Sequence, residues 1–292
     1  MFKKLYDIDE IICTGGIDYV YIRYNGDVFK CNAHNFSYND DLKIFDINHE
    51  LNENLLNINP ICNCRTCNPQ CDGLNTQQWI NGKRVSNSSF CYPCRYVNEF
   101  KDLNRSHYSV ILDIVNGCIN NCIYCDNTVN NRHKIEFMNI EKCINFLKFI
   151  NYHKKGEKHA VVCGMGEPLY HPNFYEFFNQ IIELHFYTTI VSSLINVDLD
   201  KFADNFNKIK LNNENLLAFI SFNISYHPTS PLFDHDNFIK NIETLLKNKI
   251  VINHINFVDH DENKKYLNLI ETFCSSKSIN LIKLNYNVIK KL

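Results

Sequence analysis

The sequence predicts an α/β protein in which a partial (β/α)6 barrel follows a small cysteine-rich, metal-binding domain that contains a β-hairpin. From residue 107 onward, short apolar segments alternate with helix-length amphipathic segments, which indicates parallel strands joined by helical crossovers. Of the 14 cysteines, all but Cys143, Cys163 and Cys274 precede residue 126. We therefore expect a cysteine-rich domain over residues 1–106 and a barrel over residues 107–292.

The first predicted element is a β-hairpin between Cys13 and Cys31. Alternating residues on both sides of Asn25 and Gly26 favour two antiparallel strands joined by a tight primed turn. A denser run of cysteines follows the hairpin: Cys62, Cys64, Cys67, Cys71, Cys91 and Cys94. Because residues 1–10 lack the apolar core of a secretory signal, this cysteine usage favours metal binding over disulfides.

These eight cysteines are as many ligands as two [4Fe–4S] clusters require. Two of the spacings, Cys64-x2-Cys67 and Cys91-x2-Cys94, also match one half of a zinc site. Zinc is therefore the alternative to iron and sulfide in this domain, and the spacing does not divide the eight cysteines between two sites.

The barrel is expected to contain six strands with helices between them. The expected strands cover residues 108–115, 160–163, 187–191, 216–225, 251–257 and 280–286. The expected helices cover residues 139–153, 173–185, 198–208, 236–248 and 263–275. In barrels of parallel strands, active sites gather at the C-terminal ends of the strands.

Three cysteines follow the first of these strands directly, at Cys118, Cys122 and Cys125. Their C-x3-C-x2-C spacing supplies three thiolates to one metal cluster. Structural zinc and ordinary electron-transfer clusters usually take four protein ligands. A [4Fe–4S] cluster held by three thiolates keeps one iron open, so this loop indicates chemistry at the fourth position.

The second strand runs into a Gly164-Met165-Gly166-Glu167-Pro168 segment. Together with the three-cysteine loop and Tyr124 just before its third cysteine, this segment resembles the radical S-adenosylmethionine (radical SAM) superfamily. The resemblance implies a TIM-like partial barrel, a [4Fe–4S] cluster and S-adenosyl-L-methionine as cofactors. It also implies reductive cleavage to a 5′-deoxyadenosyl radical that abstracts a hydrogen atom from a substrate carbon.

The same resemblance assigns roles around the cofactor. Glu167 matches the position whose carboxylate contacts the methionine ammonium, and the backbone of residues 164–168 lines that ligand. Ser192 and Ser193 end the third strand and Ser225 ends the fourth, where related enzymes place hydroxyls that bind the ribose. Serine at a strand end is otherwise an ordinary turn residue.

Two further residues are candidates for chemistry. His227 follows the fourth strand and could order the substrate or relay a proton, because histidine titrates near neutral pH; a structural histidine is the alternative. Cys163 adjoins the cofactor segment and could donate a hydrogen atom in a radical epimerisation. Burial as a small hydrophobe is the ordinary fate of a free cysteine and the one expected for Cys143 and Cys274.

The N-terminal cysteines resemble the SPASM auxiliary-cluster domain, although that domain ordinarily follows the barrel and its second half is spaced differently. This resemblance implies two auxiliary [4Fe–4S] clusters and a peptide or protein substrate that is oxidised, crosslinked or epimerised. A radical dehydrogenase or epimerase of a sugar or other small metabolite is the alternative. A non-catalytic zinc- or cluster-binding interaction protein is the alternative of a different class.

Net charge and the lengths of the apolar segments limit the classes of partner that we expect. The formal net charge of −2 gives no electrostatic reason to expect nucleic acid or a membrane surface. No segment is long and apolar enough to cross a bilayer. Composition therefore predicts a cytoplasmic protein. The radical SAM resemblance implies an iron–sulfur oxidoreductase that takes electrons from a reductant such as flavodoxin or ferredoxin.

Overall fold

A computed structural model gives the fold of the chain. It describes residues 11–13, 19–29, 43–52, 77–80, 83–86, 94–96, 107–123, 134–154, 156–164, 166–212 and 219–285. Within these ranges, no helix combines the length and apolar character needed to cross a membrane.

The predicted six-stranded parallel sheet is confirmed. Its strands are β8 (His107–Asp113), β11 (Glu157–Cys163), β12 (Tyr187–Ser192), β13 (Ile220–Tyr226), β14 (Val251–Asp259) and β15 (Leu281–Asn285). They are adjacent in chain order, and every neighbouring pair is parallel. The sheet is open among the described strands, so this part of the chain forms a partial (β/α)6 barrel.

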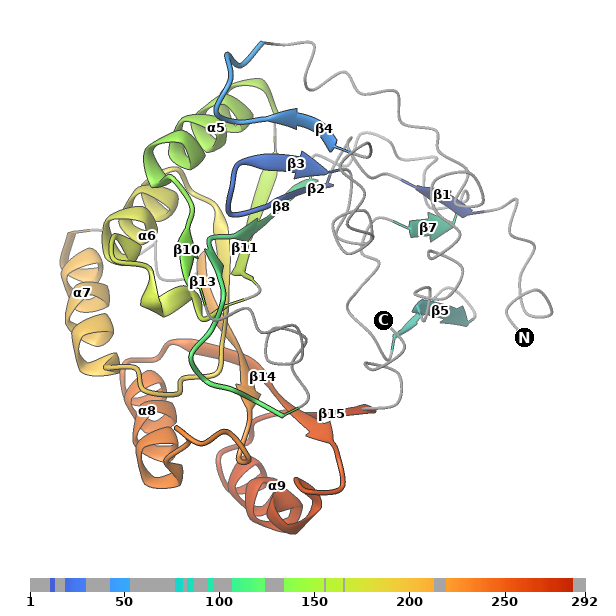
Figure 1. Cartoon of the computed structure of the whole chain (residues 1–292), viewed down its shortest axis with the longest axis vertical. Coiled ribbons are helices and arrows are strands. Elements are labelled where there is room, and N and C mark those ends of the chain that lie inside the picture. The colour runs from blue at the N-terminus through green and yellow to red at the C-terminus, as the bar shows by residue number, and fades with distance from the viewer. Residues whose placement is uncertain are drawn as a thin grey trace.

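Five α-helices connect these strands and lie on the outer side of the curved sheet (Figure 1). They are α5 (Ile140–His153), α6 (Phe174–Glu183), α7 (Leu199–Asn212), α8 (His235–Lys247) and α9 (Leu267–Ser276). Two of them begin at side-chain caps, since Asn139 and Asp234 accept hydrogen bonds from backbone N–H groups of the first turn.

The hydrophobic core lies between the helices and one face of the sheet. Alternate residues of each strand contribute to it, as Val110 and Leu112 do in β8. Fully buried aromatic rings such as Phe177, Phe202 and Phe222 fill the space beneath the helices. Cys143 and Cys274 are buried in this core, which confirms their predicted packing role. The opposite face of the strands is left for the interior of the barrel.

The predicted hairpin exists, and it belongs to the barrel sheet. Its strands β2 (Tyr19–Ile22) and β3 (Asp27–Phe29) are antiparallel, and β4 (Lys43–Asp46) pairs with β3. Strand β2 in turn runs parallel to β8, so the sheet has nine strands. The boundary at residue 106 stays a prediction, but these three strands are continuous with the barrel.

The turn of this hairpin differs from the predicted primed type. Gly26 donates its N–H to the Arg23 carbonyl at 2.8 Å, and Arg23 donates to the Asp27 carbonyl at 2.8 Å. A type I′ turn with Asn25 and Gly26 at its centre needs positive φ at both. Among the described residues, positive φ in this turn occurs at Gly26 alone, at 96°. The connection is therefore the longer kind, in which one glycine takes the left-handed position.

Three short pairings complete the described strands. Strand β1 (Ile11–Cys13) is antiparallel to β7 (Cys94–Tyr96), and β5 (Gln77–Ile80) is antiparallel to β6 (Lys83–Ser86). Strand β9 (Val115–Asn116), directly after β8, pairs with β10 (Glu136–Phe137). The last pairing holds the two ends of the segment that contains the cysteine loop.

Candidate active site

The cysteine loop opens at the C-terminal end of β8, as predicted. Cys118 follows β9 and is partly exposed, whereas Cys122 is buried. The backbone N–H of Asn120 points to the Cys118 sulfur, 3.5 Å away. Tyr124 and Cys125 lie outside the described residues. Two of the three predicted cluster ligands are thus placed at the edge of the sheet where barrel active sites form.

The glycines after β11 pack against the entry to this loop. A Cβ atom on Gly164 would overlap the Asp113 carboxylate and lie 2.9 Å from the Val115 carbonyl oxygen. A Cβ atom on Gly166 would overlap the Gly117 carbonyl and lie 2.8 Å from the Val115 carbonyl oxygen. Glycine at both positions therefore lets the ends of β8 and β11 approach closely. Met165 lies outside the described residues.

Glu167 is buried at the end of this segment, with 2% of its surface exposed. Its Oε2 accepts hydrogen bonds from the Ser193 backbone N–H at 2.8 Å and from the Ser193 hydroxyl at 2.7 Å. Its side chain also caps the short 3-10 helix η6 (Pro168–Tyr170) by accepting from the Leu169 N–H. Burial raises the pKa of Glu167 above its usual value, and the hydrogen bonds from serine oppose that rise.

Asn120 joins the cysteine loop to Glu167. It lies between the first two cysteines with 3% of its surface exposed. Its amide donates to the Ser193 hydroxyl at 2.9 Å, and that hydroxyl donates to Glu167. Its side-chain oxygen accepts from the Tyr170 hydroxyl at 3.2 Å, and its carbonyl accepts from Ser230. These contacts fix the cysteine loop against the carboxylate through side chains from three other segments.

Sequence reasoning missed Asn120, Tyr170 and Ser230. Asparagine is abundant along the chain, and a position between two ligand cysteines is usually a loop residue, so the spacing carried no signal for Asn120. Tyr170 follows the Gly164 to Pro168 segment and could have been suspected from that proximity alone. Its hydroxyl also donates to the Ile195 carbonyl at 2.9 Å, and its burial beside Glu167 and Cys118 raises its pKa.

The three predicted ribose serines occupy different environments. Ser193 contacts Glu167, as described, and Ser192 accepts from the Leu194 N–H at 3.0 Å as a turn residue does. Ser225 lies near the end of β13, opposite Asn256 of β14, and is partly exposed. The structure thus brings Ser193 and Ser192 to the Glu167 carboxylate, with Ser225 one strand farther along the sheet.

Two candidate residues have shifted pKa values. Burial of the ring lowers the pKa of His227 to about 4. Desolvation disfavours the charged ring, which places this pKa below the near-neutral value expected from sequence. The role of His227 stays a prediction. Burial and the neighbouring Asp113 raise the pKa of Cys163, which lies opposite Asp113 in the sheet. Cys163 therefore holds its proton as a thiol at neutral pH.

The comparisons identify the family. The sequence profile of the Radical SAM superfamily matches residues 112–273, more than half of the 292-residue chain. The chain belongs to the radical SAM superfamily. Its members are iron–sulfur enzymes, so a [4Fe–4S] cluster and S-adenosylmethionine are its cofactors. No curated protein matches the radical SAM chain.

Solved structures similar to this radical SAM chain include anSMEcpe with bound AdoMet, at 18% identity, a TM-score of 0.47, and coverage of 61% of this chain and 52% of that one. For anSMEcpe with bound AdoMet and the Cp18Cys peptide, the identity is 17% and the TM-score 0.46, with coverage of 61% of this chain and 50% of that one. For Streptococcus suis SuiB, the identity is 13% and the TM-score 0.33, with coverage of 65% of this chain and 52% of that one. The chain spans about half the length of these proteins.

The described residues fit the radical SAM cofactors. Soft thiolates are the ligands of iron–sulfur clusters, and Cys118 and Cys122 lie where β8 ends. The buried Glu167 carboxylate beside that loop suits the ammonium group of an amino acid. Of the predicted auxiliary ligands, Cys13 and Cys94 lie in described strands. The others fall outside the described residues: Cys31, Cys62, Cys64, Cys67, Cys71 and Cys91.

Proposed function

We propose that this chain cleaves S-adenosylmethionine reductively and abstracts a hydrogen atom from a substrate carbon. Cys118, Cys122 and Cys125 would hold the cluster, and Glu167 would bind the methionine ammonium. The observation that carries the proposal is the hydrogen-bonded connection from the cysteine loop through Asn120 and Ser193 to Glu167. An anionic side chain is thereby held beside the ligand loop, in a buried position.

In this proposal, the protein residues orient S-adenosylmethionine. Cys118, Cys122 and Cys125 would hold the cluster, which would supply the electron for the reductive cleavage of S-adenosylmethionine. Glu167 directs the amino-acid end of the cofactor, and its charge offsets that of the ammonium, which makes burial of both groups less costly. Ser193 keeps the carboxylate in one orientation with two donors. Residues 164–168 bring the backbone close to the cofactor.

The N-terminal cysteines are proposed to bind two auxiliary [4Fe–4S] clusters, with zinc as the alternative. Cys13 and Cys94 are opposite each other in the antiparallel pair of β1 and β7. This register supports assigning Cys13 and Cys94 to one metal site, although they are far apart in sequence.

We propose a peptide or protein substrate, whose modification would be an oxidation, a crosslink or an epimerisation. The resemblance of the N-terminal cysteines to the SPASM domain supports it. A sugar or other small metabolite that is dehydrogenated or epimerised is the second candidate.

Metal and sulfide counts with product analysis test the proposal. After anaerobic reconstitution, three clusters give about twelve irons per chain, which fall to about eight when Cys118, Cys122 and Cys125 are replaced by alanine. If the wild type instead holds about four irons and the triple-alanine variant none, with zinc retained in both, the radical site stands and the N-terminal domain is a zinc domain. 5′-Deoxyadenosine formed with a flavodoxin or ferredoxin reductant supports the enzyme. Its absence from a protein with full iron supports a binding protein instead.

A further inference from the structure

The hairpin of β2 and β3 is part of the barrel, although it lies in sequence between two proposed auxiliary ligands. Val20 and Ile22 of β2 are opposite Val110 and Leu112 of β8 in a parallel pairing. All four side chains are almost completely buried in the same core. The hairpin therefore has a fixed position relative to β8, whose end leads into the cysteine loop.

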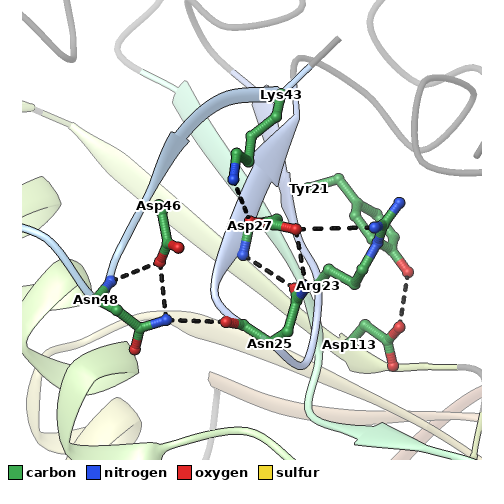
Figure 2. A network of polar contacts seen from close by, with 8 residues as sticks. All are labelled: Tyr21, Arg23, Asn25, Asp27, Lys43, Asp46, Asn48 and Asp113. Atoms are coloured by element: carbon green, nitrogen blue, oxygen red, sulfur yellow. Dashed lines mark hydrogen bonds and ion pairs between the residues drawn. The ribbon is translucent and has the colours of Figure 1, made fainter. Parts of the chain in front are cut away.

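Tyr21 carries this fixed position to the other face of the sheet. Its side chain alternates with Val20 and Ile22 and therefore points away from the core. The Tyr21 hydroxyl donates to the Asp113 carboxylate at 3.2 Å, and both residues are buried (Figure 2). The other Asp113 oxygen occupies the place that a Cβ atom on Gly164 would take. Asp113 thus lies between the hairpin and the glycine segment that leads to Glu167.

The other end of the cysteine-loop entry is held by β10. Glu136 is opposite Asn116 in the pairing of β10 with β9, and it accepts from the Asn116 amide at 3.1 Å. Asn116 is two residues before Cys118. The entry to the cysteine loop is therefore held by the hairpin at Asp113 and by β10 at Asn116.

The hairpin is itself braced by a polar network. Asp27 accepts from the Asn25 amide at 2.8 Å and forms ion pairs with Lys43 at 2.9 Å and Arg23 at 3.8 Å (Figure 2). The Asn48 amide donates to the Asn25 carbonyl at 2.9 Å. These contacts tie the turn to β4 and the residues after it. Tyr21 is accordingly presented from a stiff element rather than from a loose loop.

We propose that the hairpin positions the cluster-binding loop through Tyr21, which acts through Asp113. Tyr21 is a positioning residue, and its role rests on the proposed function. It sets where residues 113–117 lie against the glycine segment, and so how Cys118 is placed relative to Glu167. The chain between Cys13 and Cys31 is therefore connected by hydrogen bonds to the radical site.

The test compares Tyr21→Phe with Tyr175→Phe, a matched loss of one hydroxyl on the outer helix α6. Both keep the aromatic ring, so packing is preserved. Iron content should match that of the wild type in both variants. In Tyr21→Phe we expect the KM for S-adenosylmethionine to rise about tenfold, because one hydrogen bond to a buried carboxylate is lost. We also expect faster iron release to a chelator and an altered electron paramagnetic resonance change on adding S-adenosylmethionine.

Two outcomes would overturn the proposal. One is a Tyr21→Phe protein that matches Tyr175→Phe in KM, iron release and spectrum. The other is a double variant in which the effects of Tyr21→Phe and Asp113→Asn on the KM for S-adenosylmethionine add. A residue that acts through Asp113 should change the KM little once Asp113 is changed. A wild type that holds iron but does not cleave S-adenosylmethionine defeats the proposed function instead, and the iron-release rates then decide the positioning role.

Discussion

Replacing Ser193 with alanine should lower the free energy of unfolding and shift the pH dependence of cofactor binding. The hydroxyl donates to the buried Glu167 carboxylate at 2.7 Å and accepts from the Asn120 amide at 2.9 Å. Hydrogen bonds to charged groups contribute about 1.5–3 kcal/mol. Because the Ser193 backbone N–H still donates to Glu167 at 2.8 Å, we expect a loss near the lower end, about 2 kcal/mol.

This loss of unfolding free energy can be measured as a decrease in melting temperature. For a chain of this size, 1 kcal/mol corresponds to about 2–4 °C, so the midpoint should fall by about 4–8 °C. Ser276→Ala, on the exposed end of α9, is the control for the loss of a hydroxyl from the surface. The measurement is anaerobic thermal unfolding of the cluster-loaded protein. A midpoint within about 1 °C of the control would refute the reasoning.

The substitution also has a functional consequence. Donors to the ionised carboxylate lower its pKa, so removing one raises the pKa of Glu167 further above its usual value. The pH below which S-adenosylmethionine binding weakens should therefore move upward in Ser193→Ala. An unchanged binding profile combined with the lower melting temperature would assign Ser193 a role in stability alone.

Two further predictions concern Glu167 and Cys163. In the wild type, affinity for S-adenosylmethionine should fall as the pH falls through the raised pKa of Glu167, because the protonated carboxyl loses its charge; equilibrium dialysis should show this slope in the wild type and its loss in Glu167→Gln. Since burial and Asp113 raise the pKa of Cys163, its thiol should resist iodoacetamide at neutral pH in the folded protein, as measured by mass spectrometry against the unfolded chain. Cys163→Ala that retains turnover to the normal product would exclude a hydrogen-donor role.

The barrel could be predicted because its signals are local. Each strand is a short apolar run, each helix has an amphipathic period, and their alternation implies parallel pairing. The order of β8 through β15 follows directly from that alternation. The cysteine loop and Glu167 were also accessible, since strand ends of a parallel sheet meet at one edge. The link between them through Asn120 was not, because it depends on contacts between residues distant in sequence.

The position of the hairpin was the main difference between expectation and structure. A hairpin was predicted from alternation, which is typical of a sheet with one face in solvent. In β2, however, Val20, Tyr21 and Ile22 are all buried. Burial on both faces is typical of an interior strand, and the run from Tyr19 to Ile22 contains no charged residue. That uninterrupted apolar run was the available signal that β2 pairs on both sides.

The same feature predicts the outcome of separating the two predicted domains. A chain of residues 107–292 alone would lack β2 and leave the edge of β8 unpaired beside the cysteine loop. Exposed strand edges promote aggregation, and the core would also lose Val20, Ile22 and Val28. We expect this truncated chain to aggregate in size-exclusion chromatography, whereas the full chain does not. A monomeric truncated chain that still binds about four irons would show that the barrel folds independently of the hairpin and would contradict its positioning role.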